Sequence, residues 1–88
     1  MVSSTVEVTN SLSHNLTLWF EPWAESIVIE SKKSVFVEIM TPTEHAIEIA
    51  QDPEGMVFFG APNGTIKVLN SDREVIWKAW GPAPGIPK

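Results

Sequence analysis

Two histidines, His14 and His45, are the residues of this chain best suited to bind a metal or to transfer protons near neutral pH. A carboxylate such as Glu44 or Asp52 could complete a metal site with them. The histidines lie far apart in the sequence, and nothing in their spacing requires them to meet. A solvated loop histidine and a histidine at the start of a strand explain the same residues, so we expect no metal site and no cofactor.

Two pairs of acids, Glu21 with Glu25 and Asp52 with Glu54, have a spacing at which one carboxyl could act as acid and the other as base. Acids at turns and strand ends are usually just solvated. The chain contains none of the nucleophile-elbow, phosphate-loop, zinc-protease or dinucleotide-binding motifs. A chain of this size also provides little wall for a water-excluding cleft. We therefore expect a protein that is not an enzyme, with no catalytic residues.

Aromatic residues form the most distinctive stretch, Leu18-Trp19-Phe20-Glu21-Pro22-Trp23. Indoles on a flat platform beside hydrogen-bonding groups can stack on sugars. A carbohydrate-binding module that uses Trp19, Trp23 and Trp80 is therefore one hypothesis. The alternative is that a small domain uses its indoles as core or as cover for an edge, because each indole buries a large apolar area.

The composition describes one small globular domain. The chain has 88 residues, of which 43% are hydrophobic, enough for a single core and too few residues for a second. Its net charge of −5 has the wrong sign for a protein that binds nucleic acid or an anionic membrane surface through charge. The absence of cysteine excludes disulfide scaffolds and thiolate chemistry. With neither a secretory signal nor a membrane-spanning run in the sequence, we expect a cytoplasmic protein.

Short runs of alternating apolar and polar residues recur, each closed by turn-forming residues, and no window keeps the period of a helix. The pattern predicts an all-β fold, a small antiparallel β-sandwich of seven or eight short strands, immunoglobulin-like or cupredoxin-like; a small β-barrel is the alternative. The short Ser31-Lys32-Lys33 turn predicts a tight hairpin between its two neighbouring strands. The expected strands are 5–9, 16–20, 26–30, 34–39, 45–50, 56–59, 65–69 and 73–77.

The alternation also predicts which side chains fill the core. We expect a single sandwich domain over 1–79 and a Pro/Gly-rich C-terminal tail over 80–88, which cannot form a central strand or a helix. The inward positions include Val6, Val8, Leu16, Leu18, Phe20, Ile27, Ile29, Val35, Val37, Ile39, Ile47 and Ile49.

A second set of large apolar residues falls on the opposite parity: Trp19, Val28, Phe36, Phe58, Leu69 and Ile76. They are covered by the loop around Trp23 and by the tail with Trp80 and Ile86, or they form an exposed apolar patch. Such a patch would mark self-association or a protein partner. The main hypothesis is thus a non-catalytic binding module, with Trp19, Trp23, Phe36 and Trp80 as candidate binding residues.

The stretch from Asn15 to Trp23 and the later stretch from Phe59 to Val68 together resemble a pattern found in short bacterial all-β proteins. The more specific part is L-x-L-W-x-E-P-W, which starts at Leu16. The resemblance covers about half of the chain. It implies a bacterial all-β domain and brings no activity and no site residues with it.

Overall fold

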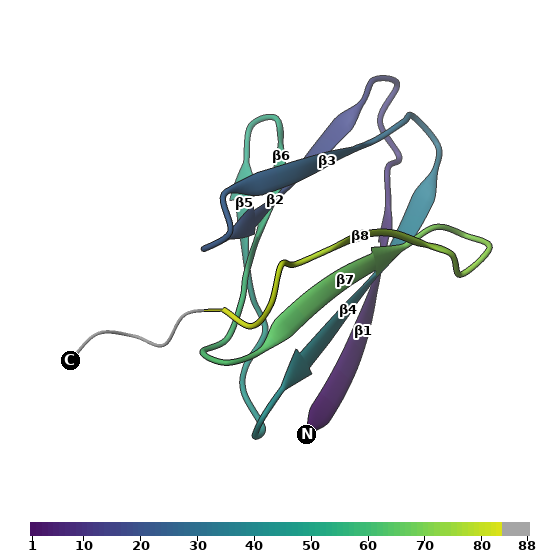
Figure 1. The fold of residues 1–88 in the computed structure, drawn as a ribbon. Coiled ribbons are helices and arrows are strands. Elements are labelled where there is room, and N and C mark those ends of the chain that lie inside the picture. Colours follow the sequence, from purple (N-terminus) through teal and green to yellow (C-terminus); the bar gives the residue numbers. More distant parts are fainter. Residues whose placement is uncertain (84–88) are drawn as a thin grey trace.

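The computed structural model describes residues 1–83 as two packed four-stranded sheets (Figure 1). It confirms the all-β sandwich, with eight strands. The first sheet has the order β1 (Val2–Thr9), β4 (Ser34–Thr41), β7 (Thr65–Leu69) and β8 (Val75–Lys78). The second sheet has the order β3 (Glu25–Ile29), β2 (Leu16–Glu21), β6 (Gly55–Phe59) and β5 (Glu48–Asp52).

The strand pairing differs from the prediction in two respects. Strands β2 and β6 run parallel, with Thr17 opposite Gly55, whereas the other neighbours are antiparallel. The predicted hairpin around Ser31-Lys32-Lys33 is wrong, because β3 and β4 belong to different sheets. The turn itself forms, since the Lys33 amide donates to the Glu30 carbonyl at 3.1 Å. Its residues specify a reversal of the chain, and after this reversal the chain continues into the first sheet as β4.

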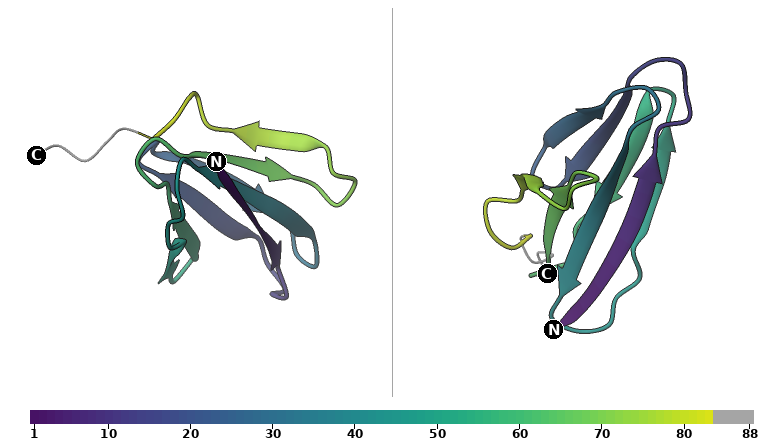
Figure 2. Two further views of the ribbon diagram at one scale, coloured as in Figure 1. Left: turned by 90° about the horizontal axis from the view of Figure 1, so that it is seen from below. Right: turned by 90° about the vertical axis from the view of Figure 1, so that its right-hand side faces the viewer.

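The core lies between the two layers and is built from the inner faces of the central strands (Figure 2). Leu18, Phe20 and Val37 are completely buried, as their parity predicts, and Val68 is completely buried as well. Phe58, predicted on the outer face, is completely buried as well. The register of the parallel pair sets Phe58 beside Phe20, so that it shares the inward face of that strand.

Strand β5 does not bury the predicted core residues Ile47 and Ile49. The strand begins only at Glu48, so Ile47 precedes it, and both isoleucines are more than a third exposed, at 37% and 38%. Ile49 lies opposite Phe58 and therefore faces the interior. It remains accessible because β5 is an edge strand, and parity alone does not distinguish the middle of a sheet from its edge.

Aromatic residues close the flank where edge strands β3 and β8 meet. Trp77 stacks on Phe20, with ring centroids 4.3 Å apart and planes at 15°. Its indole N–H donates to the Glu25 carboxylate at 3.3 Å, and Trp23 meets Trp77 edge-on at 6.3 Å. This closed flank ties one sheet to the other. The opposite flank, between edge strands β1 and β5, has no such aromatic bridge among the residues described above.

The first residues of the predicted tail pack back onto the domain. Ala83 is buried, and its amide donates to the Gly64 carbonyl at 2.8 Å. Its own carbonyl accepts from the Asn63 amide at 2.9 Å. Ala83 therefore covers the connection between β6 and β7. The predicted contribution of Ile86 lies outside the described residues.

Candidate functional site

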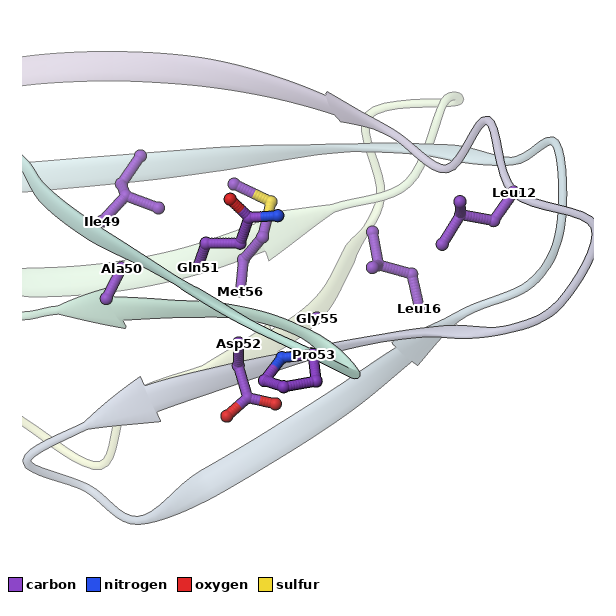
Figure 3. Close-up of a pocket in the computed structure, with 9 residues that line it drawn as sticks. All are labelled: Leu12, Leu16, Ile49, Ala50, Gln51, Asp52, Pro53, Gly55 and Met56. Atoms are coloured by element: carbon purple, nitrogen blue, oxygen red, sulfur yellow. The ribbon is translucent and has the colours of Figure 1, made fainter.

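A groove of about 520 Å³ opens on the flank between β1 and β5 (Figure 3). Its walls come from the loop after β1, from the start of β2, and from the β5–β6 hairpin. Figure 3 shows the side chains of Ile49, Gln51 and Met56 directed from the hairpin toward β1. The lining residues are Leu12, Leu16, Ile49, Ala50, Gln51, Asp52, Pro53, Gly55 and Met56.

Most of these side chains are apolar, and Leu12, Ile49 and Pro53 are exposed. Leu12 is 43% accessible and Ile49 is 38% accessible, while Leu16 and Met56 are half-buried against the core. Two more apolar side chains are exposed near the same edge strands, Val2 at 39% in β1 and Ile47 just before β5. We call this region, with the groove at its centre, the open flank.

The buried amide of Asn10 positions Leu12. Its side-chain nitrogen donates to the carbonyls of Ile29 and His14, each at 2.9 Å, and its oxygen accepts from the Leu12 amide at 3.0 Å. Asn10 therefore ties the loop after β1 to the end of β3. These bonds satisfy backbone groups that would otherwise be unpaired, and they fix the conformation of the loop. The position of the apolar Leu12 side chain follows from that conformation.

The far wall of the groove is held by a tight turn. The Asp52 carboxylate accepts from the Glu54 amide at 3.0 Å, which is the local bond expected when Asp begins a turn. Gly55 then allows β6 to lie against β2, since a Cβ there would be only 1.7 Å from the Thr17 carbonyl oxygen. This register places Ile49, on β5, and Met56, on β6, in the wall of the groove.

The predicted binding residues do not form one surface. Trp19 faces outward from β2 in the second sheet and is half-buried, with Val57 and Ser26 as its register partners. Phe36 faces outward from β4 in the first sheet, where the Arg73 guanidinium lies 3.9 Å from its ring centroid. Because the two residues lie on the outer faces of different sheets, the molecule separates them.

The other two predicted residues lie toward the closed flank. Trp23 is half-buried beside Trp77, and its ring fills the space next to Gly60. Trp80 follows β8 and is 90% exposed. The structure thus uses Trp23 as cover for the core and leaves Trp80 accessible. Neither residue lines the groove.

The candidate residues for acid, base or metal chemistry are spread over the surface. His14 and His45 are both exposed, and the Nδ1 atom of His45 lies 2.8 Å from the Ala46 carbonyl. Within residues 1–83, no group of three or more His, Asp or Glu side chains could hold a metal ion. In the same range, no helix is long and apolar enough to cross a membrane.

The comparisons with known proteins add no family and no relative. No protein-family model matches the chain, and neither the curated proteins nor the solved structures gave a significant match. The bacterial origin implied by the resemblance therefore stays a prediction.

The groove was not predicted from the sequence, because no single sequence pattern indicates it. Leu12 was the available signal, an isolated large apolar residue within the polar loop of Asn10, Ser11, Ser13 and His14. Met56 and Ile49 read as ordinary strand residues. Only the sheet order shows that both lie near the β5 edge of the sheet, with which no further strand of residues 1–83 pairs.

Proposed function

We propose that this protein is a non-catalytic binding module that recognises protein segments through its open flank. The observation that carries the proposal is the difference between the flanks of the sandwich. Trp77, Trp23 and Glu25 close one flank, while the other presents an apolar groove with exposed Leu12 and Ile49. We keep the expectation of a cytoplasmic location, which rests on the sequence alone.

The chemistry of the groove favours an apolar segment as its ligand. Burying exposed aliphatic side chains contributes about 25 cal/mol per Å² of apolar surface removed from water. Exposed apolar side chains that gather beside a cavity are typical of protein-interaction sites. The Gln51 amide, in the groove wall, adds a polar group that can fix the orientation of a bound backbone.

A selection from a random dodecapeptide library tests the proposal. We expect the enriched peptides to carry apolar residues at alternating positions and to bind the wild-type chain at micromolar or weaker affinity. Ile49→Lys places a charge in the groove and should reduce that binding at least about tenfold, because it must be desolvated when a peptide docks.

The matched control is Val28→Lys. Val28 is also an exposed aliphatic strand residue, but it faces outward from β3 and does not line the groove. This variant should bind the selected peptides as the wild type does. An equal loss in both variants, or a selection that enriches nothing, contradicts the proposed function.

A second candidate function, carbohydrate binding, is supported by Trp80. An indole that is 90% exposed offers both of its faces for stacking on a sugar ring. Titration with a glycan panel should then shift the tryptophan emission, and Trp80→Ala should remove the shift. No response across the panel rejects this candidate.

A further inference from the structure

We propose that the open flank binds a second copy of this chain, through antiparallel pairing of β1 with the β1 of its partner. This inference rests on the proposed function and names the partner. It starts from the edges of the two sheets, since an uncovered edge strand is a template for pairing with another chain.

Three of the four edge strands are poor templates. Strand β8 has four residues, pairs across a register shift between Val68 and Leu69, and ends at Lys78. Strands β3 and β5 have five residues each, and Pro53 directly follows β5. Short strands, bulges, lysine and proline are the usual devices that prevent pairing at an edge.

Strand β1 has none of these devices. All eight of its residues pair with β4 in an uninterrupted register from Val2 opposite Thr41 to Thr9 opposite Ser34. It contains neither proline nor lysine, and Glu7 is its one charged residue. An eight-residue strand presents an edge about 26 Å long. Among residues 1–83, only β4 pairs with β1, so the other edge of β1 is available to a second strand along its whole length.

The hydrogen bonds identify which groups of β1 are free. The Asn10 amide donates to the Lys33 carbonyl at 2.9 Å, directly beyond the last pair of the ladder. Hydrogen-bonded and non-bonded positions alternate in an antiparallel pair, so the even-numbered residues of β1 bond to β4. The backbone amides and carbonyls of Ser3, Thr5, Glu7 and Thr9 consequently point away from the sheet.

These free groups are complementary to themselves. With Ser3 opposite Thr9 and Thr5 opposite Glu7 of the second copy, all four free residues of each strand are paired, by about eight hydrogen bonds. This register avoids setting the two Glu7 carboxylates directly opposite each other, which would be destabilising. The two-fold axis then passes midway between the two Val6 residues, which face each other.

The apolar side chains of the open flank lie beneath this strand pair. A flank about 26 Å long and roughly as deep as the shortest 21 Å extent of the molecule gives about 500 Å² per copy, or about 1,000 Å² in total. That area is at the lower limit for a specific interface. We therefore infer a weak dimer, with a dissociation constant of roughly 10 μM to 1 mM.

Sedimentation equilibrium from about 5 μM to about 2 mM measures the association. Thr5→Pro should raise the dissociation constant at least about 30-fold, because it removes an outward N–H and leaves the bonds to β4 in place. Thr5→Val keeps that N–H and should dimerise as the wild type does. A wild-type chain that stays monomeric, or a dimer insensitive to Thr5→Pro, overturns the inference.

A cysteine pair tests the register independently of any proline effect on folding. The chain has no native cysteine. In the inferred dimer, Cys at position 6 faces its own copy at a Cα separation of about 4.5 Å, within reach of a disulfide, whereas Cys at position 4 lies about 14 Å from its copy. Val6→Cys should therefore form a covalent dimer under oxidised glutathione.

Ser4→Cys should remain monomeric under the same oxidation. Equal cross-linking of Ser4→Cys and Val6→Cys, or none with Val6→Cys at dimer-forming concentrations, overturns the inferred pairing. A monomeric chain that still binds the selected peptides through Ile49 removes the inference and leaves the proposed function standing. Conversely, a chain that dimerises as inferred but binds none of the selected peptides contradicts the proposed peptide binding and leaves the inferred dimer standing.

Discussion

Asn10 shows most directly how one residue can hold a surface in place. Its side chain is completely buried and makes three hydrogen bonds to backbone groups, two as donor and one as acceptor. Two of these bonds, with the Leu12 amide and the His14 carbonyl, hold the loop that carries Leu12, and the third reaches the end of β3. The geometry of the groove therefore depends on an amide that does not line it.

We expect Asn10→Ala to destabilise the fold by about 2 to 4 kcal/mol, since it leaves buried backbone groups without partners. Urea denaturation followed by circular dichroism measures the loss. Asn70 is the matched control, because it bridges Asp72 and Glu74 in the exposed β7–β8 turn by the same kind of bonds. Asn70→Ala should cost about 1 kcal/mol. Equal losses would show that the burial of Asn10 does not matter.

Replacing a fully buried aliphatic residue with an acid tests the core at the same scale. Leu18→Asp and Val37→Asp each bury an unpaired carboxyl, at a cost of several kcal/mol against a total of about 4 to 13 kcal/mol for a chain of this length. We expect both variants to be unfolded at 25 °C by circular dichroism and by proton NMR. Val28→Asp, on the outer face, should stay folded. A cooperative unfolding transition in either core variant would show that the variant is folded, and it would refute the assigned parity.

At the scale of elements, the close contact of the parallel strands β2 and β6 depends on a glycine. Gly55 sits where β6 crosses closest to β2, and any side chain there meets the backbone of Thr17. Since backbone cannot move aside as a flexible side chain can, the pair must separate to admit a methyl group.

Gly55→Ala should therefore destabilise the protein by about 3 kcal/mol or more. Gly81→Ala provides the contrast, because a Cβ at Gly81 meets nothing within 4 Å and only the positive φ of 107° opposes it. We expect Gly81→Ala to cost about 1 to 2 kcal/mol. Urea midpoints of the two variants give the comparison. A larger loss of stability for Gly81→Ala than for Gly55→Ala would contradict the inferred collision between a side chain at position 55 and the backbone of β2.

Element by element, the sequence predicts local structure better than it predicts partners. The alternation of Val35, Val37 and Ile39 defines both the strand and its buried face, because the period of a strand is local. The Ser31–Lys33 turn predicts a reversal correctly and a hairpin wrongly, since the destination of a strand depends on the whole core. Ile49 was correctly predicted to face inward, but it is not buried, because its strand lies at the edge of the sheet.

The whole molecule combines one flank closed by aromatic residues with one that is open. Trp77, contributed by the last strand, bridges both sheets through Phe20 and Glu25. Three of the four indoles of the chain were among the candidate binding residues predicted from the sequence, and of these Trp23 takes part in this closure by meeting Trp77. The site that results is defined by sheet order, which no local pattern encodes.

Indole accessibility provides a test at this scale. Trp80 is 90% exposed, whereas Trp19, Trp23 and Trp77 are half-buried. Acrylamide should therefore quench one emission component more strongly than the rest, and Trp80→Phe should remove that component and shift the remaining emission to shorter wavelength. Four equally quenched indoles would mean that the closed flank is open in solution.

The position of the indoles also determines which assays can detect a ligand. The nine residues that line the groove include no tryptophan, and the chain has no tyrosine. A molecule that docks there leaves the intrinsic ultraviolet emission of the protein unchanged, so a screen by that readout returns a false negative. Isotope-edited methyl NMR of Leu12, Ile49 and Met56 is the appropriate detector for this side of the protein.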